Sequence, residues 1–233
     1  MVIPFAQVIN YNNQPFKIEC VELVMAPPFK KLVESLASPK GPGPSTTFSM
    51  FHIFYALELV AEKPIGRTKL AEKLKVGEGA IRTIVSRLKS AGLIVTSKEG
   101  CNLTDKGANL WKQLSKVFPK RIKIEKTPLT TSEYNYAFLV RNSGHKVESG
   151  IDQRDAAIMG GARRALAIIS NRGNLVIDSV SNNLKKDFPE AANVILRELK
   201  PEDNDVIIIA GADNLLKAKR GAFAASWVLI GDD

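Results

Sequence analysis

The sequence predicts an α+β protein with two domains, and three observations support that prediction. Apolar residues in the middle third of the chain recur at helical spacing, whereas the second half alternates between strand-like and helix-like segments. A segment rich in Pro, Gly and Ser (residues 38–47) precedes that middle third. Thirteen basic and six acidic side chains lie within residues 47–120, which therefore carry +7 of the chain's net charge of +9. We expect an N-terminal extension (residues 1–46), a first domain (residues 47–120), and a separate α+β domain with a mixed sheet (residues 121–233).

The overall composition, 45% hydrophobic and 24% charged, is that of an ordinary soluble globular protein. Its longest apolar runs, such as residues 222–230, are far too short to span a bilayer. The first ten residues lack the basic region and the small-residue cleavage site of a signal peptide. These features predict a cytoplasmic protein. Met25 is an alternative start, in which case residues 1–24 would be an extension.

The cysteine and histidine content argues against a metal site. Cys20 and Cys101 are far apart in the sequence, and only His52 and His145 could join them as ligands. We therefore expect two reduced thiols, no metal and no cofactor.

Two apolar runs before the Pro/Gly-rich segment, residues 2–10 and 16–25, flank the turn-like sequence YNNQP and predict a β-hairpin. Pro4 argues against a central strand there. Residues 29–36 predict a short helix.

The first domain shows the element order of a winged helix-turn-helix. Apolar residues spaced for a core helix occur in SMFHIFYALELVAE, and a short helix follows in PIGRTKLAEKLKV. Gly77 and Gly92 bracket a third helix as its N-cap and its C-terminal glycine. LIVTS and CNL, joined by KEG, predict a two-stranded hairpin. Thr104 then caps a last helix, which Pro119 ends. Three helices, a hairpin and a helix in this order are typical of that fold.

The third helix has two different faces. Its buried face is predicted from the spacing i, i+3, i+4, i+7: Ile81, Ile84, Val85 and Leu88. The opposite face carries small residues with arginines on its flanks: Gly79, Thr83 and Ser86, with Arg82 and Arg87. Small residues allow close approach to base edges, and arginines can bind guanine or phosphate. This distribution predicts a recognition helix in the major groove of DNA.

Three residues at the start of the preceding helix, Arg67, Thr68 and Lys69, are suited to contacts with the DNA backbone. Lys98, at the tip of the hairpin, could contact phosphate or enter a minor groove. For each residue the alternative is a solvated surface position, and Glu78 could either complement the helix dipole or accept a hydrogen bond from cytosine. The predicted DNA-binding set is Arg67, Thr68, Lys69, Gly79, Arg82, Thr83, Ser86, Arg87 and Lys98.

A resemblance extends this prediction. The pattern IGR…LAEKL…GEGAIRT…RLK…GLI…LTDKG resembles the winged helix-turn-helix region of archaeal transcriptional regulators that carry an uncharacterised C-terminal domain. IDQRDAAIMGGA and GADNLLKAKRGAFAA are similar to the second domain of that family. The resemblance implies sequence-specific DNA binding and gene regulation, without identifying the target genes.

The second domain is predicted to contain strands and helices in alternation. The predicted strands are RIKIEK, YNYAFLVR, ALAII, NLVIDSV and DVIIIAG. In IDQRDAAIMGGA, Asp152 as N-cap and Asp155 at the third helical position would form a variant capping box. The alternative is an effector site at the carboxyl end of the DVIIIAG strand. That site would contain Asp152, Arg154, Asp155, Asp213 and Asn214.

No phosphate loop, nucleotide-binding glycine motif, nucleophile elbow or HExxH occurs in the sequence, so we expect no enzymatic activity. The sequence predicts a DNA-binding transcriptional regulator that forms a homodimer on double-stranded DNA and has a possible small-molecule effector and no membrane partner. Two alternatives differ in class: a protein–protein interaction module of the transcription machinery, and an enzyme tethered to a winged helix.

Overall fold

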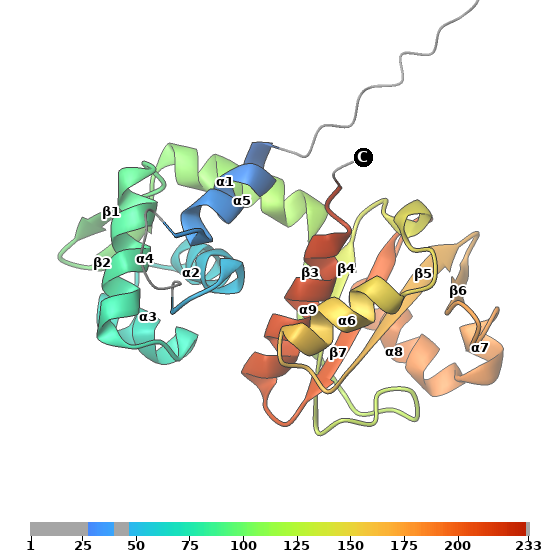
Figure 1. The fold of residues 1–233 in the computed structure, drawn as a ribbon. Helices are drawn as coiled ribbons and strands as arrows, with labels where there is room; N and C mark the ends of the chain where they lie inside the picture. Colours follow the sequence, from blue (N-terminus) through green and yellow to red (C-terminus); the bar gives the residue numbers. More distant parts are fainter. Residues whose placement is uncertain (1–27, 40–46, 232–233) are drawn as a thin grey trace, which may run out of the picture.

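The computed structural model describes residues 28–39 and 47–231, which form two lobes (Figure 1). The hairpin predicted at residues 2–10 and 16–25 lies outside the described residues, as does Cys20. The N-terminal lobe contains five helices and a hairpin: α1 (Pro28–Ala37), α2 (Met50–Glu62), α3 (Arg67–Leu74), α4 (Glu78–Ser90), β1 (Ile94–Ser97), β2 (Gly100–Leu103) and α5 (Asp105–Val117). This is the predicted winged helix-turn-helix, with α4 as the third helix of the motif and β1–β2 as the wing.

The wing is attached to the helices by backbone contacts. Ile65, just before α3, pairs with Cys101 of β2 through two backbone hydrogen bonds of 2.8 and 3.2 Å. A side chain at Gly100, which has φ +127°, would collide with the backbone of Ile65. Gly107 of α5 is similarly pressed against the carbonyl of Leu93. These contacts fix the wing relative to α3 and α5.

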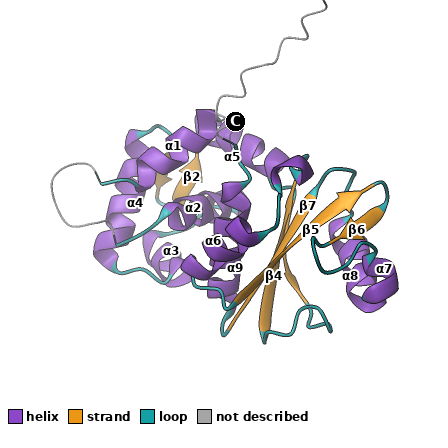
Figure 2. Cartoon of the chain, turned by 45° about the vertical axis from the view of Figure 1, so that its right-hand side comes forward, coloured by secondary structure: helices purple, strands orange, loops and turns teal. Residues whose placement is uncertain are grey.

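Residues 28–37 pack with the helices of the N-terminal lobe, although the sequence analysis assigns them to the N-terminal extension. α1 packs against α2, α4 and α5 (Figures 1 and 2). Its buried side chains, Phe29, Val33 and Leu36, are part of the same core cluster as α2 and α4.

The start of α2 is held by a histidine. The backbone N–H of Ser49 donates to Nδ1 of His52 at 2.9 Å, so that Ser49 and His52 form a capping box. Burial lowers the pKa of His52 to about 4, and the positive charge of Arg220 acts in the same direction. His52 is therefore neutral in the folded protein near pH 5.

This histidine is expected to make stability depend on pH. Between its unfolded pKa of about 6.5 and its folded pKa of about 4, the unfolded chain binds a proton that the folded protein does not. The free energy of unfolding should therefore fall by on the order of 2 kcal/mol as the pH drops through that window. Urea unfolding of the wild type and of His52→Gln at several pH values measures this change in the free energy of unfolding. Glutamine preserves the capping box without titrating, so equal pH dependence in both proteins would contradict the assignment.

The second lobe is an antiparallel sheet covered on both faces (Figure 2). Its five strands have the order β3-β4-β7-β5-β6, and every neighbouring pair is antiparallel. The strands are β3 (Lys120–Ile124), β4 (Tyr134–Val140), β5 (Arg164–Asn171), β6 (Asn174–Val176) and β7 (Val206–Ala212). The helical elements are η1 (Gly144–Lys146), α6 (Ile151–Met159), α7 (Leu184–Asp187), α8 (Pro189–Leu199) and α9 (Leu215–Val228).

The prediction of a mixed sheet was wrong, because β7 is antiparallel to both of its neighbours. Both faces of β7 are buried. Phe138 and Ile208 point to the side of α6 and α9, where they join the core of the N-terminal lobe. Leu139 and Ile207 point to the opposite side, where a second apolar cluster contains residues of α7 and α8. A strand covered on both faces is apolar throughout, whatever the direction of its neighbours.

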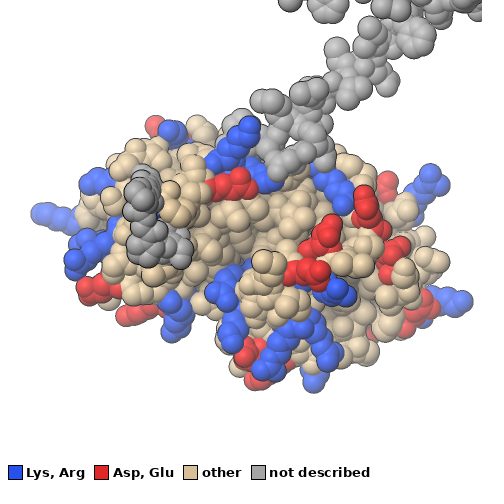
Figure 3. Space-filling model, viewed as in Figure 1, with Lys and Arg blue, Asp and Glu red and all other residues tan. Residues whose placement is uncertain are grey.

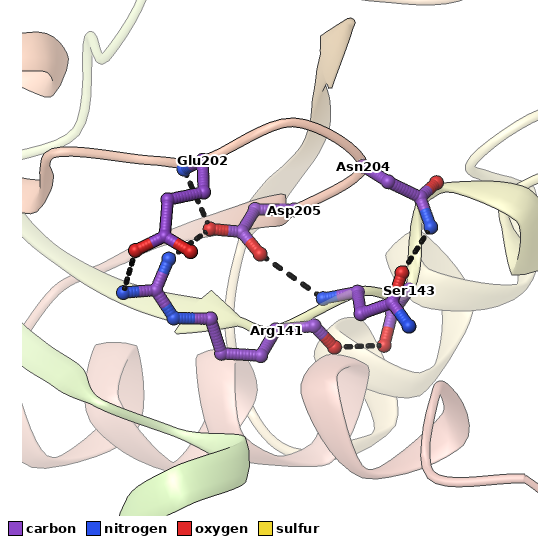
Figure 4. A network of polar contacts seen from close by, with 6 residues as sticks. Arg141, Ser143, Glu202, Asn204 and Asp205 are labelled. Atoms are coloured by element: carbon purple, nitrogen blue, oxygen red, sulfur yellow. Dashed lines mark hydrogen bonds and ion pairs between the residues drawn. The ribbon is translucent and has the colours of Figure 1, made fainter.

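A polar network closes the end of the sheet where β4 ends and β7 begins (Figure 4). Asp205 is buried, and its carboxylate accepts hydrogen bonds from Arg141 Nη1 at 2.5 Å and from the backbone N–H groups of Asn142 and Glu202. Arg141 also pairs with Glu202 at 3.0 Å. These partners satisfy the hydrogen-bonding capacity of the buried carboxylate. A structural role therefore accounts for the whole network.

The two lobes share an apolar interface. Phe54 of α2 packs against Phe118, Phe138 and Phe223, with ring centroids 4.8 to 6.0 Å apart, and Trp227 stacks on Phe223. These rings come from α2, from the end of α5, from β4 and from α9. The N-terminal lobe is thus packed directly on the second lobe.

A buried ionic cluster lies in the same interface. Glu58 of α2, only 6% exposed, pairs with Lys219 of α9 and with Arg121 of β3, whose Nε lies 2.8 Å from Glu58 Oε1. The Lys219 ammonium lies 3.9 Å from the centroid of the Tyr55 ring. Burial lowers the pKa of Lys219, whereas the charge and hydrogen bond of Glu58 raise it. Glu58 therefore joins one helix of the first lobe to a helix and a strand of the second.

Candidate nucleic-acid interface

A groove of about 590 Å³ runs between α4 and the wing. Four cationic side chains from three different segments line it: Arg67 at the start of α3, Arg82 and Lys89 on α4, and Lys98 at the wing tip. Ser86, Thr96 and Ser97 add hydroxyl groups. None of the residues that line this groove is acidic. The groove can therefore attract a polyanion and offer it several hydrogen-bond donors.

α4 presents the two faces that its sequence predicts. Ile81, Ile84, Val85 and Leu88 are buried, whereas Arg82, Thr83 and Ser86 are exposed. The Thr83 hydroxyl donates to the carbonyl of Gly79 at 2.9 Å and therefore has a fixed position on the outer face.

Gly79 is not required by the fold. A Cβ built at Gly79, or at Gly77, meets no atom within 4 Å. Because neither residue has a positive φ, both positions could carry a side chain without strain. Open space in the first turn of α4 leaves its backbone accessible to a partner, as close approach to a duplex would require.

Glu78 pairs with Arg82 at 3.1 Å on the exposed surface of α4. An exposed i,i+4 pair contributes only about 0.3–0.5 kcal/mol. Nucleic acid can therefore displace Glu78 and bind Arg82 at little cost. A smaller hollow of about 150 Å³ between α3 and α4 brings Arg67, Thr68 and Arg82 together with Glu78.

The remaining residues of the predicted DNA-binding set differ in whether they line these hollows. Lys98 is exposed and lines the large groove, whereas Lys69 is exposed but lines neither hollow. Lys89 was missed by the sequence analysis, although it lies seven residues after Arg82 and therefore on the same side of the helix. Its Nζ lies 3.5 Å from the hydroxyl of Thr96, so it connects α4 to the wing.

Arg87 does not belong to this surface, and its predicted role in DNA binding was wrong. It is 8% exposed, and its Nη1 donates hydrogen bonds of 2.7 Å to the carbonyls of Leu36 and Ser38. Its guanidinium also lies over the ring of Phe48. Arg87 therefore binds the last carbonyl groups of α1, where a cation is favoured by the helix dipole.

The five residues predicted for an effector site do not lie together. Asp152, Arg154 and Asp155 lie in the first half of α6, where Arg154 pairs with Asp155 and both are exposed. Gly150, not Asp152, is the N-cap. Asp213 and Asn214 directly follow β7.

The sheet register separates these two groups. α6 follows the end of β4, where Val140 pairs with Val206 at the start of β7. α6 ends just before Arg164, which pairs with Gly211 near the end of β7. Asp213 thus lies beside the end of α6, and a hydrogen bond from Lys217 lowers its pKa. The predicted effector site was wrong in its composition because its members lie at opposite ends of α6.

Comparisons with known proteins agree with this geometry. Residues 50–118 match the family model described as the CggR N-terminal DNA binding domain, and residues 131–229 match a domain of unknown function, DUF4443. The hypothetical protein PH0730 from Pyrococcus horikoshii OT3 is 27% identical; the match covers 78% of this chain and 92% of that one, with a TM-score of 0.65. Among curated proteins, none matches.

A wild-type structure of ZitR from Lactococcus lactis is also 27% identical, over 33% of this chain and 56% of its own, with a TM-score of 0.27. The family matches therefore show an N-terminal DNA-binding domain like those of regulators, followed by a domain of uncharacterised role. Within the described residues, no helix has the length and hydrophobicity needed to cross a bilayer.

Proposed function

We propose that this protein is a sequence-specific transcriptional regulator that places α4 in the major groove of duplex DNA. The observation that supports it most is the groove between α4 and the wing, where Arg67, Arg82, Lys89 and Lys98 converge. In this arrangement Arg82 and Ser86 contact bases, with Thr83 beside them. Arg67, Lys69, Lys89 and Lys98 bind the phosphates on either side.

The proposal has further parts. The protein acts as a homodimer on two half-sites, because readers with a recognition helix usually pair through two-fold symmetry. The second lobe senses a small molecule, contributes to dimerisation, or both. The chain is a cytoplasmic, archaeal-type regulator without enzymatic activity. The competing function is a module that uses its winged helix to bind another protein of the transcription machinery.

Selection from a random duplex library, followed by titration at several salt concentrations, tests the proposal. We expect one enriched motif bound at least about 10³-fold more tightly than unrelated duplex. The logarithm of the binding constant should fall with the logarithm of salt concentration with a slope of about −3 to −4 for each protomer, since about four cations contact phosphate. A two-fold symmetric motif would support the homodimer. Absence of enrichment, or binding insensitive to salt, would favour the protein-binding alternative.

A further inference from the structure

An apolar hollow of about 690 Å³ lies between the two lobes. Its walls come from α1 and α2 on one side and from α6 and α9 on the other, with Met50, Phe51, Met159, Phe223, Trp227 and Val228 as its apolar lining. Lys30 and Glu34 line it on the α1 side, where the Glu34 carboxylate accepts a hydrogen bond from Trp227 Nε1 at 3.1 Å. Figure 3 shows this face, with a largely uncharged surface between the lobes. Hollows of this size at domain interfaces are typical sites for small ligands.

A second hollow, of about 530 Å³, adjoins the first, because Phe51 and Arg220 line both. Its lining includes Lys75 and Lys217 as well as Arg220, and none of its described lining residues is acidic. One side of the shared boundary is thus apolar and the other is cationic. We use the term interlobe cleft for the two hollows together.

Arg220 is held at this boundary. Its Nε donates to the carbonyl of Gly160 at the end of α6, which fixes the plane of the guanidinium. Within the described part of the chain, no hydrogen bond occupies its Nη groups. A guanidinium fixed in this way can bind a carboxylate through two parallel hydrogen bonds.

We propose that the interlobe cleft binds a small amphipathic carboxylate. The aliphatic or aromatic body of the ligand lies against Met159, Phe223 and Trp227, and its carboxylate binds Arg220 at the boundary with the cationic hollow. Lys75 adds positive potential on that side, whereas the charge of Lys217 is partly neutralised by Asp213, 3.0 Å from its Nζ. This site differs from the acidic set predicted from the sequence, which would have repelled such an anion.

The position of the cleft gives the ligand a means of regulation, which rests on the proposed function. A ligand in contact with α2 and α9 binds both lobes at once. It therefore favours whichever relative arrangement of the lobes best closes the cleft. Since α2 belongs to the DNA-binding lobe, that preference is coupled to DNA affinity, and the coupling must be reciprocal.

Calorimetric titration of the full chain with decanoate, below its micelle concentration, tests the site. We expect one molecule per protomer, with decanol binding at least about tenfold more weakly because it lacks the charge. Arg220→Gln should abolish the preference for decanoate over decanol. Tighter binding of decyl phosphate than of decanoate would overturn the choice of a carboxylate.

Two neighbouring residues of α6 provide a matched pair of variants. Met159 is 89% exposed and lines the cleft, whereas Ile158 is 45% exposed and does not. Met159→Glu should weaken decanoate binding at least tenfold, and Ile158→Glu should leave it unchanged. Both side chains are exposed, so both variants should fold. Equal effects of the two substitutions, or no binding by the wild type, would overturn the proposal.

DNA binding measured with and without saturating decanoate separates the two proposals. A change of at least about fivefold in DNA affinity, lost in Met159→Glu, is expected if the cleft regulates the DNA-binding lobe. Decanoate binding with the expected variant pattern but without any effect on DNA affinity would overturn the regulatory part alone. Decanoate binding by a protein that binds no DNA would overturn the proposed function and leave the ligand site intact.

Discussion

Replacing Glu58 by glutamine is expected to lower the free energy of unfolding by about 3–5 kcal/mol, because it leaves buried cations without their counter-charge. Among the described residues, Glu58 is the only acidic side chain that forms an ion pair with Lys219, and it also binds Arg121 at 2.8 Å. A typical domain is stable by about 5–15 kcal/mol, so this loss is a large fraction of the total. Urea unfolding followed by circular dichroism measures it.

Glu58 has two cationic partners, Arg121 and Lys219, so a variant that removes only one of them serves as the control for Glu58→Gln. Lys219→Met removes one cation but leaves Glu58 paired with Arg121, so its cost should be smaller, about 1–2 kcal/mol. The double variant Glu58→Gln/Lys219→Met should be no less stable than Glu58→Gln, because the two residues interact directly. A cost below about 1 kcal/mol for Glu58→Gln would mean that water reaches the cluster.

The effect of Glu58→Gln should also depend on pH. Burial already lowers the pKa of Lys219, and removal of Glu58 takes away the main opposing effect. The unfolded chain then binds a proton at pH values where the folded variant does not, up to the ordinary lysine pKa of about 10.4. Stability of the variant relative to the wild type should therefore recover as the pH rises from 7 toward 10.

Local features of the N-terminal lobe could be predicted because they depend on neighbouring residues. The spacing of Ile81, Ile84, Val85 and Leu88 identifies the buried face of α4. Thr104 caps α5 as expected, with its hydroxyl accepting from the N–H of Gly107 at 3.0 Å. Periodicity and capping need only residues within a few positions of one another.

Features that depend on distant segments could not be predicted in this way. The helical wheel places Arg87 on a flank of α4, but its role depends on α1, about fifty residues earlier. Asp152 and Asp213 were grouped as one site because each lies at the end of an element. Only the strand register shows that Asp213, which follows β7, lies beside the end of α6, whereas Asp152 lies at the start of that helix. The interlobe cleft likewise has no sequence signal, since its lining comes from four helices and from Lys75 at the end of α3.

The double variant Arg82→Ala/Lys98→Ala is expected to bind its selected DNA motif about 30- to 1,000-fold more weakly than the wild type. Arg82 alone should contribute about 1–3 kcal/mol, and its loss should relax the sequence preference at one base pair. Lys98 should weaken binding to all duplexes alike and reduce the salt slope by about 1. The residues lie on α4 and on the wing tip, so their effects should add. Fluorescence anisotropy at several salt concentrations measures both quantities.

Two further variants show whether these losses come from the groove or only from net charge. Lys116→Ala removes one positive charge from α5, outside the groove, and should change affinity little. Glu78→Gln should strengthen binding, because it frees Arg82 from its 3.1 Å ion pair and removes a negative charge near the phosphates. Weaker binding by Glu78→Gln, with relaxed preference at a single cytosine, would instead make Glu78 a base-reading residue. Equal losses in Arg82→Ala and Lys116→Ala would contradict the placement of α4 in the major groove, because that placement requires the position of the charge, and not its sum, to determine affinity.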